Sequence, residues 1–265
     1  MYSKFQLAIN YLKHQLHASN SKGHGIHSPF IFYLVDLVLN DHQTYPAYKK
    51  IEAIRKKLMK DKRILQLEDF GAGSAVSKTN SRSISSIVKT AVKSKKYGQL
   101  LFRIVYNLKP ENILELGTSF GLTTAYIAMA NPASNVITCE GSSQVAEIAN
   151  QNFKNLELEN IELVEGNFDD SILPILNRLQ KLDLVFFDGN HRKEATLNYF
   201  HSCLPKAVEK SVFIFDDIHW SEEMESAWKM IKSDPAVNCT VDLFFIGLVF
   251  FRPEFKEKQH FLIRF

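Results

Sequence analysis

From residue 112 onward, short apolar runs alternate with longer amphipathic segments. The runs have the length of strands and are almost uniformly apolar, as expected for parallel strands covered by helices on both faces. The segments between them have helical periodicity. The pattern therefore predicts a doubly wound, Rossmann-like α/β sheet. The predicted strands are 113–116, 136–139, 161–164, 182–187 and 212–215.

The C-terminal stretch CTVDLFFIGLVFFR departs from this alternation. Its two apolar runs meet at Ile246-Gly247, which leaves no room for a crossover helix between them. Two strands joined so closely must be antiparallel. We therefore expect a C-terminal antiparallel hairpin at the edge of a seven-stranded sheet.

Residues 1–109 have mainly helical patterns. Apolar residues recur with helical spacing over 4–17, and Ser28-Pro29 fits the cap and first turn of a helix that ends near Asn40. Further helices are predicted from Pro46 and over 97–108. The sequence thus predicts a helical N-terminal cap, residues 1–95, followed by a catalytic domain, residues 96–265.

Composition excludes several classes of protein. A chain of 265 residues with 45% hydrophobic and 23% charged residues is neither disordered nor fibrous. The net charge of +3 conceals an asymmetry, because residues 1–109 carry 19 basic and 6 acidic residues, whereas residues 110–265 carry 13 and 23. Such asymmetry is typical of two parts with different roles.

Cysteine usage and hydropathy favour a cytoplasmic protein. The three cysteines, Cys139, Cys203 and Cys239, are far apart and form no CxxC pair, so neither a disulfide framework nor a zinc module is predicted. The longest apolar run, 243–251, has nine residues, about half of what a spanning helix needs. We expect no membrane partner.

Two glycine-rich segments are candidates for a nucleotide-binding turn. The first, LEDFGAG at 67–73, is followed by a polar, serine-rich stretch instead of an amphipathic helix. The second, with Gly117 and Gly121, is followed by a helix and then by a strand that ends directly before Glu140. A carboxylate at this position can accept hydrogen bonds from ribose hydroxyls, which favours nucleotide binding over a tight turn without a ligand.

The segment ILELGTSFGLTTAYIA, residues 113–128, resembles the first motif of class I S-adenosylmethionine (SAM) methyltransferases, in particular the catechol O-methyltransferase-like group. The resemblance extends from about Gly98 to the C-terminus and implies SAM as cofactor. It implies that Glu115 holds the ammonium of the methionine part and that Glu140 binds the ribose. As an alternative, backbone amides alone satisfy Glu115. The other cofactor-binding residues implied are Gly117, Thr118, Gly121, Asn167, Phe168 and Asp188, with Asn167 and Phe168 at the adenine.

Aspartates follow the fourth and fifth predicted strands. Asp188 ends one strand, and Asp216 and Asp217 end the next, so their carboxylates are expected at the same edge of the sheet. Oxygen ligands of this kind suit Mg²⁺ or another divalent cation. The metal-dependent members of the group hold their cation at the corresponding positions, although Asp217 stands where they usually have Asn. The alternative is that these aspartates cap the following helices and bind no metal.

His191 is the predicted catalytic base, together with Asp188 as a catalytic residue. The group commonly has a Lys three residues after the strand-four Asp, and this chain has His191 there. An imidazole with a pKa near 6.5 can remove a proton from an acceptor hydroxyl at neutral pH. Lys193 and His219 are further candidates.

The basic N-terminal region leaves its partner open. In this group, N-terminal helices cover the SAM cleft, so a lid, or docking against the acidic half within the chain or in a homodimer, is the leading interpretation. The basic residues of 78–96 and of 49–63 also suit a phosphate backbone, which would make the acceptor an RNA, such as a tRNA.

Together these features predict a SAM-dependent O-methyltransferase that acts on a hydroxylated small molecule with help from a divalent cation. Two alternatives stay open: an RNA methyltransferase, and a module that binds SAM without turnover. The aspartates at the strand ends favour the enzyme, because a binding module does not need them.

Overall fold

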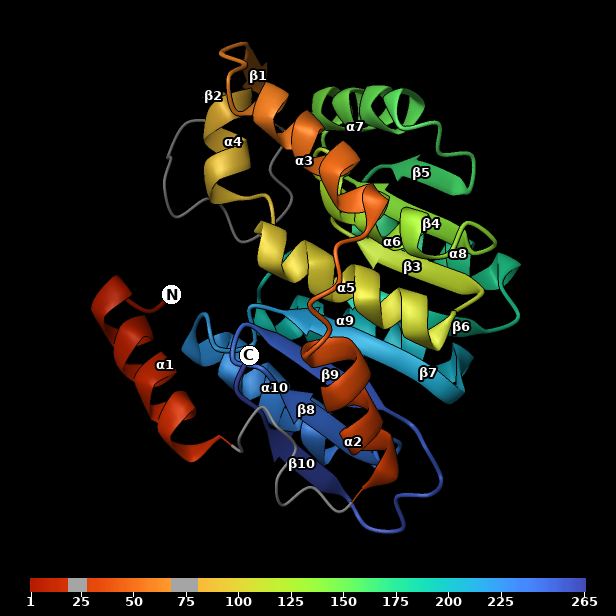
Figure 1. Ribbon diagram of the computed structural model, residues 1–265. Helices are drawn as coiled ribbons and strands as arrows, with labels where there is room; N and C mark the ends of the chain where they lie inside the picture. Colours follow the sequence, from red (N-terminus) through yellow and green to blue (C-terminus); the bar gives the residue numbers. More distant parts are fainter. Residues whose placement is uncertain (19–27, 68–80) are drawn as a thin grey trace. The chain divides into compact units, whose positions relative to one another are not determined.

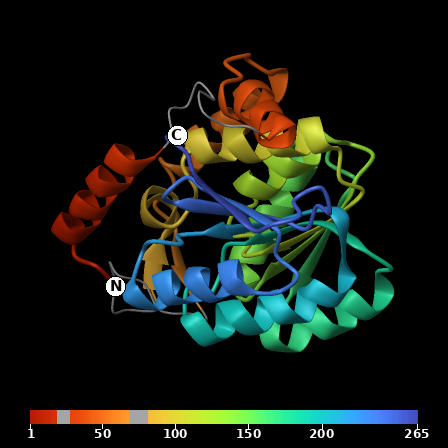
Figure 2. The same ribbon diagram turned by 90° about the horizontal axis from the view of Figure 1, so that it is seen from below.

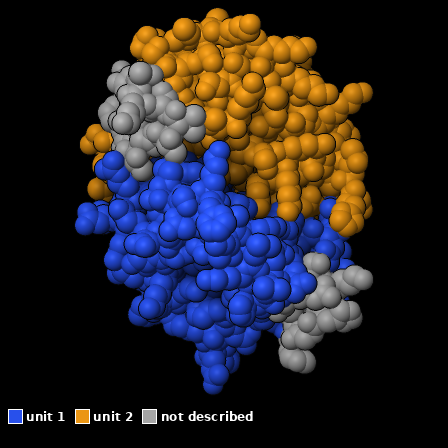
Figure 3. Space-filling view, turned by 90° about the vertical axis from the view of Figure 1, so that its left-hand side faces the viewer, with its two compact units in different colours: residues 1–41, 176–265 blue, residues 42–175 orange. Residues whose placement is uncertain are grey.

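The computed structural model describes residues 1–18, 28–67 and 81–265, which form two compact units (Figures 1 and 3). Unit 1 consists of Met1–Asp41 and Leu176–Phe265, and unit 2 consists of His42–Ile175. The boundary predicted at residue 95 from the sequence falls inside unit 2 and stays a prediction. The glycines of LEDFGAG lie outside the described residues.

Unit 2 contains three parallel strands joined by helices. The strands are β3 (Asn112–Leu116), β4 (Asn135–Glu140) and β5 (Ile161–Glu165), with β4 in the middle. Helix α6 (Leu122–Ala130) connects β3 to β4, and α7 (Ser143–Asn155) connects β4 to β5. The turns that start these helices therefore lie at the carboxyl ends of adjacent strands, where ligands bind in open α/β sheets.

The remaining elements of unit 2 precede these strands. They are α3 (Pro46–Leu58), β1 (Ile64–Gln66), β2 (Ser81–Ser83), α4 (Ile84–Thr90) and α5 (Lys95–Leu108). Helix α3 buries Tyr48, Ile51 and Ile54 and is tied to α6 by a hydrogen bond of 2.9 Å from the Tyr126 hydroxyl to Glu52. Residues 42–95, predicted to belong to a cap, thus pack within the same unit as the glycine turn.

Unit 1 contains a mixed sheet in the order β6 (Leu182–Phe187), β7 (Ala207–Asp216), β9 (Ile246–Phe250), β8 (Cys239–Asp242) and β10 (Gln259–Leu262). β6 and β7 are parallel, whereas β9 is antiparallel to both β7 and β8. Figures 1 and 2 show α9 (Lys193–Cys203) and α10 (Glu222–Ser233) on one face of these strands and α2 (Pro29–Leu34) on the other. Helix α8 (Phe168–Arg178) begins in unit 2 and ends in unit 1.

The predicted doubly wound α/β fold and its C-terminal hairpin, β8 and β9, are confirmed. The number of strands differs from the prediction, because the described part of units 1 and 2 contains eight strands in this sheet pattern instead of seven. The additional strand β10 pairs in parallel with β8, so the hairpin is not at the edge. The sequence QHFL is short and half polar, which gave β10 no strand signal.

The N-terminal helices begin as predicted. Helix α1 (Lys4–His17) has Ser3 as its N-cap, with a reciprocal hydrogen bond to Gln6, and α2 has Ser28 as its N-cap and Pro29 in its first turn. A π-helical turn (Val35–Leu39) continues α2 to Asn40. Throughout the described ranges, every helix is too short or too polar to span a lipid bilayer.

Candidate functional site

The turn after β3 in unit 2 is held in a strained but well-connected conformation. Gly117, Ser119 and Gly121 have φ angles of 111°, 48° and 73°. The backbone amides of Gly117 and Thr118 both donate to the carbonyl of Cys139, each at 3.0 Å. A Cβ on Gly121 would lie 2.3 Å from the Phe153 ring, so this position accepts no larger residue. The turn is thus fixed against the end of β4.

Glu140 lies at the end of β4 and contacts this turn directly. Its carboxylate accepts hydrogen bonds from the backbone amides of Ser119, at 2.8 Å, and Ser142, at 3.0 Å. Burial raises the pKa of Glu140, and the backbone amides partly oppose that shift. Each carboxylate oxygen still has a second lone pair with which to accept a hydrogen bond from a ligand hydroxyl.

Glu115, on β3, is fully buried, with 0% of its surface exposed. One carboxylate oxygen accepts hydrogen bonds from the hydroxyls of Thr124 and Thr138, the latter at 2.7 Å. The other oxygen, Oε1, is buried and has no hydrogen-bond partner among the described residues. Burial, opposed by the two threonine bonds, raises the pKa of Glu115 to about 7. A buried acceptor without a partner is uncommon and fits a ligand that supplies a cationic donor.

The other predicted cofactor residues of unit 2 have structural contacts of their own. The Thr118 hydroxyl lies 2.6 Å from that of Thr138, which joins it to the Glu115 network. Asn167 begins α8: its carbonyl accepts from the Ser171 amide at 3.0 Å and its side-chain oxygen from the Asp169 amide at 3.3 Å. Phe168, the first residue of α8, is half-buried.

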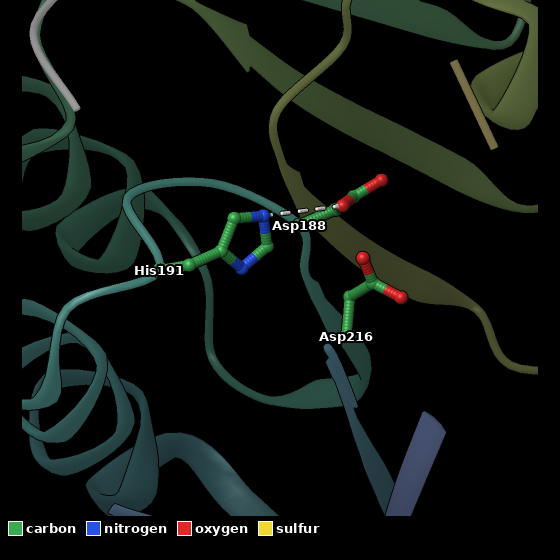
Figure 4. Close-up of side chains that lie close together, drawn as sticks. All are labelled: Asp188, His191 and Asp216. Carbon is green, nitrogen blue, oxygen red and sulfur yellow. Dashed lines mark ion pairs between the residues drawn. The ribbon is translucent and has the colours of Figure 1, made fainter. Parts of the chain in front are cut away.

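Unit 1 brings Asp188, His191 and Asp216 together (Figure 4). Asp188 follows β6, His191 lies in the next loop, and Asp216 is the last residue of β7. One potential ligand atom from each lies within 4.8 Å of the others. His191 Nε2 is 3.9 Å from Asp188 Oδ1, and Asp216 is 1% exposed. Two carboxylates and an imidazole in this arrangement have the chemistry of a site for a divalent cation.

Asp217, the third predicted ligand, follows this cluster in the chain but is not a member of it. Its backbone is left-handed, with a φ of 52°, and its carbonyl accepts the amide of Trp220 at 2.9 Å. Such a conformation is uncommon outside glycine, although Asp tolerates it better than most residues. The sequence placed the two adjacent aspartates together, but the backbone turn sends them to different surroundings.

His219, a further base candidate, is already engaged. Its Nδ1 lies 3.1 Å from Glu225 and its Nε2 lies 2.8 Å from Asp242, so both ring nitrogens face carboxylates. Burial disfavours the charged ring, but these hydrogen bonds outweigh it and raise the pKa of His219. An imidazole with both nitrogens protonated and bonded is not a base, which leaves His191 and Lys193 of the original candidates.

Comparisons with known proteins agree with the geometry. Residues 114–218 match the family Methyltransf_24, which is described as a methyltransferase domain. The chain is 32% identical over 116 residues to a transmembrane O-methyltransferase homolog of Rattus norvegicus, 37% over 95 residues to catechol O-methyltransferase B of Danio rerio, and 28% over 103 residues to a tRNA (guanine-N(7)-)-methyltransferase of Mycoplasma mobile. These matches cover 41%, 34% and 38% of this chain and 45%, 36% and 51% of those proteins. The chain thus spans about half the length of the curated relatives it matches.

Solved structures share the fold over most of the chain. An O-methyltransferase from Bacillus cereus in complex with SAH is 20% identical, with a TM-score of 0.56 over 82% of this chain and 95% of that one. The resemblance to class I SAM-dependent methyltransferases of the O-methyltransferase type is therefore confirmed, and the chain carries a methyltransferase domain.

Sequence reasoning missed the residues that complete the two clusters. Thr124 and Thr138 bind Glu115 from α6 and β4, and no spacing rule relates them to it. Asp242 was assigned only to a strand, although it binds His219. A polar residue inside an otherwise apolar strand, such as Thr138 or Asp242, was the available signal.

Proposed function

We propose that this chain is a SAM-dependent O-methyltransferase that transfers a methyl group to a hydroxyl oxygen of a small-molecule acceptor with the help of a divalent cation. The observation that carries the proposal is the pair of carboxylates at the glycine turn. Glu115 has a buried oxygen without a described partner, and Glu140 bonds the backbone of the turn itself. A nucleotide with a cationic amino-acid part needs both features.

Four groups of unit 2 would hold SAM. The unpartnered oxygen of Glu115 would accept from its ammonium, and Glu140 would accept from its ribose. The turn at Gly117 and Gly121 allows the backbone to approach closely, and Asn167 and Phe168 would contact the adenine. When bound, SAM supplies an electrophilic methyl group on a sulfonium centre.

The cluster of unit 1 would prepare the acceptor. Asp188 and Asp216 would hold the cation, with Asp217 as the third predicted ligand, and a bound cation lowers the pKa of a hydroxyl that contacts it. His191, whose ring is a quarter exposed, would take the proton from that hydroxyl. The ring would then pass the proton to solvent.

Methyl transfer from tritiated SAM to a panel of catechols and related phenols, with Mg²⁺ or Mn²⁺ and with a chelator, tests this function. We expect labelled product that depends on the cation and is lost in Asp188→Asn. The exposed Asp170 offers a matched control, Asp170→Asn, which should keep activity. Activity that survives both the chelator and Asp217→Ala would contradict the role of the metal.

An RNA acceptor is the second candidate, because the solvent-facing side of α3 and the turn after it carries only basic charges. Lys49, Lys50, Lys56, Lys57 and Lys60 are exposed there, whereas Glu52 of the same helix is paired with Arg55 at 2.9 Å. Filter binding of bulk tRNA at two salt concentrations distinguishes the candidates. Salt-dependent binding that falls in Lys56→Glu would favour RNA, and its absence would exclude it.

A further inference from the structure

Helix α1 of unit 1 has its polar and apolar sides in an unusual arrangement. Phe5, Leu12 and Leu16 are 75%, 61% and 77% exposed. At about 100° per residue, these three side chains fall within an arc of about 40° on the helix. The buried residue of α1 is His14, which lies on the opposite side. The helix therefore turns an apolar stripe to solvent and packs with a polar side chain.

This orientation is fixed by specific contacts within unit 1. His14 Nε2 lies 3.1 Å from Asp242, and the Tyr11 ring meets that of Phe244 edge-on with 5.1 Å between centroids. Just before the helix, the Tyr2 hydroxyl donates to Glu225 at 2.8 Å and the Tyr2 amide to the Trp220 carbonyl at 3.1 Å. Turning the stripe inward would break these bonds and leave the Asp242 carboxylate without one of its donors.

The charges of α1 identify the kind of partner. Lys4 and Lys13 lie on either side of the stripe, roughly 90° from its centre. The helix contains no acidic residue, and the first one in the chain is Asp36. A stripe of Phe and Leu between lysines is typical of helices that lie in the interface of an anionic bilayer. Figures 1 and 2 show α1 at the rim of unit 1, with no other element of that unit on its outer side.

A second copy of the chain fits this surface less well. Pairing two α1 helices would bring lysines together without any acid to oppose them. The three apolar side chains also expose only about 400 Å², half of the roughly 800 Å² that each partner buries in a stable protein–protein interface.

We propose that α1 is a membrane-surface anchor that inserts Phe5, Leu12 and Leu16 into the interface of a bilayer rich in anionic lipids. This departs from the expectation of no membrane partner, which rested on the absence of a spanning segment. The anchor lies on the bilayer and spans nothing. It is independent of the proposed catalytic function.

Co-sedimentation of the full chain with vesicles tests the anchor. Vesicles of phosphatidylglycerol and phosphatidylcholine should bind it, pure phosphatidylcholine vesicles should bind it at least tenfold more weakly, and salt should weaken the binding. The triple variant Phe5→Gln, Leu12→Gln, Leu16→Gln should lose at least tenfold in binding to the anionic vesicles. Lys4→Glu with Lys13→Glu should remove the preference for anionic lipid.

A matched triple variant distinguishes the stripe from general surface hydrophobicity. Leu173, Val208 and Met230 are 59%, 39% and 48% exposed on other elements, and replacing all three by Gln should leave vesicle binding unchanged. Circular dichroism and melting temperature check that each variant folds. Failure of the wild type to bind anionic vesicles, or equal binding by both triple variants, would overturn the proposal. A dimer in light scattering that only the α1 variant dissociates would also overturn it, in favour of a second copy.

Discussion

The protonation of Glu115 should control both SAM binding and the stability of the free protein. Replacement by Gln keeps the shape of the side chain and its ability to accept the bonds from Thr124 and Thr138, but removes the charge. The pKa of Glu115 in the folded protein is about 7, compared with 4.5 for an unperturbed Glu. At neutral pH the site is thus close to half ionised before a ligand binds.

If SAM binds only to the ionised carboxylate, its affinity must rise with pH until Glu115 is fully ionised. With a pKa of about 7, the ionised fraction rises about 25-fold between pH 5.5 and pH 7.5. The affinity of the wild type should therefore gain about 25-fold more over this range than that of Glu115→Gln. Glu140, whose pKa is also raised, adds a pH dependence that both proteins share.

Stability should change in the opposite direction. The folded pKa lies above the unfolded one, so the contribution of Glu115 is complete below pH 4.5 and is lost as pH rises through 7. The shift corresponds to about 3 kcal/mol at 1.36 kcal/mol per pKa unit. Glu115→Gln should not show this loss.

Isothermal titration calorimetry with SAM across this pH range, and urea unfolding of the ligand-free protein, measure the two effects. The exposed Glu159 provides the control Glu159→Gln, which should behave like the wild type. Identical pH profiles for the wild type and Glu115→Gln would refute the reasoning.

Three further perturbations have defined outcomes. Gly121→Ala should destabilise the protein by about 2–4 kcal/mol in urea unfolding, because its Cβ would lie 2.3 Å from Phe153 at a positive φ; an unchanged midpoint would show that the turn can relax. His191→Asn should lower turnover at least 100-fold while Mn²⁺ affinity, measured by electron paramagnetic resonance, stays unchanged; a parallel loss of Mn²⁺ affinity would make His191 a ligand instead of the base. His14→Ala should cost about 1–3 kcal/mol in unfolding free energy, because Asp242 loses a buried partner, whereas the exposed Lys13→Ala should cost almost nothing.

The fold could be predicted where periodicity is strong. The runs that became β3, β4 and β6 are apolar because they are buried on both faces, and the Ser28-Pro29 pair marked the start of α2 through capping chemistry. β10 escaped prediction because its partner β8 defines it and its own sequence does not. The β1–β2 pair was missed for the same reason, since Ile64–Gln66 is too short to show a period.

The candidate site could be predicted as far as it depends on strand ends. Glu140, Asp188 and Asp216 follow strands, and the edge of a sheet gathers such residues. The surroundings of each carboxylate depend on tertiary contacts, which explains why His191 joined the cluster and Asp217 did not. The apolar stripe of α1 was visible as a period, but the sequence could not show that its polar side faces the protein.

Binding of SAM to the glycine turn is the central claim, and calorimetry of the wild type and Glu140→Ala tests it most directly. The account predicts one SAM per wild-type chain and at least tenfold weaker binding by Glu140→Ala, with Glu159→Ala unchanged. No binding by the wild type, or equal affinity in all three proteins, would contradict the account.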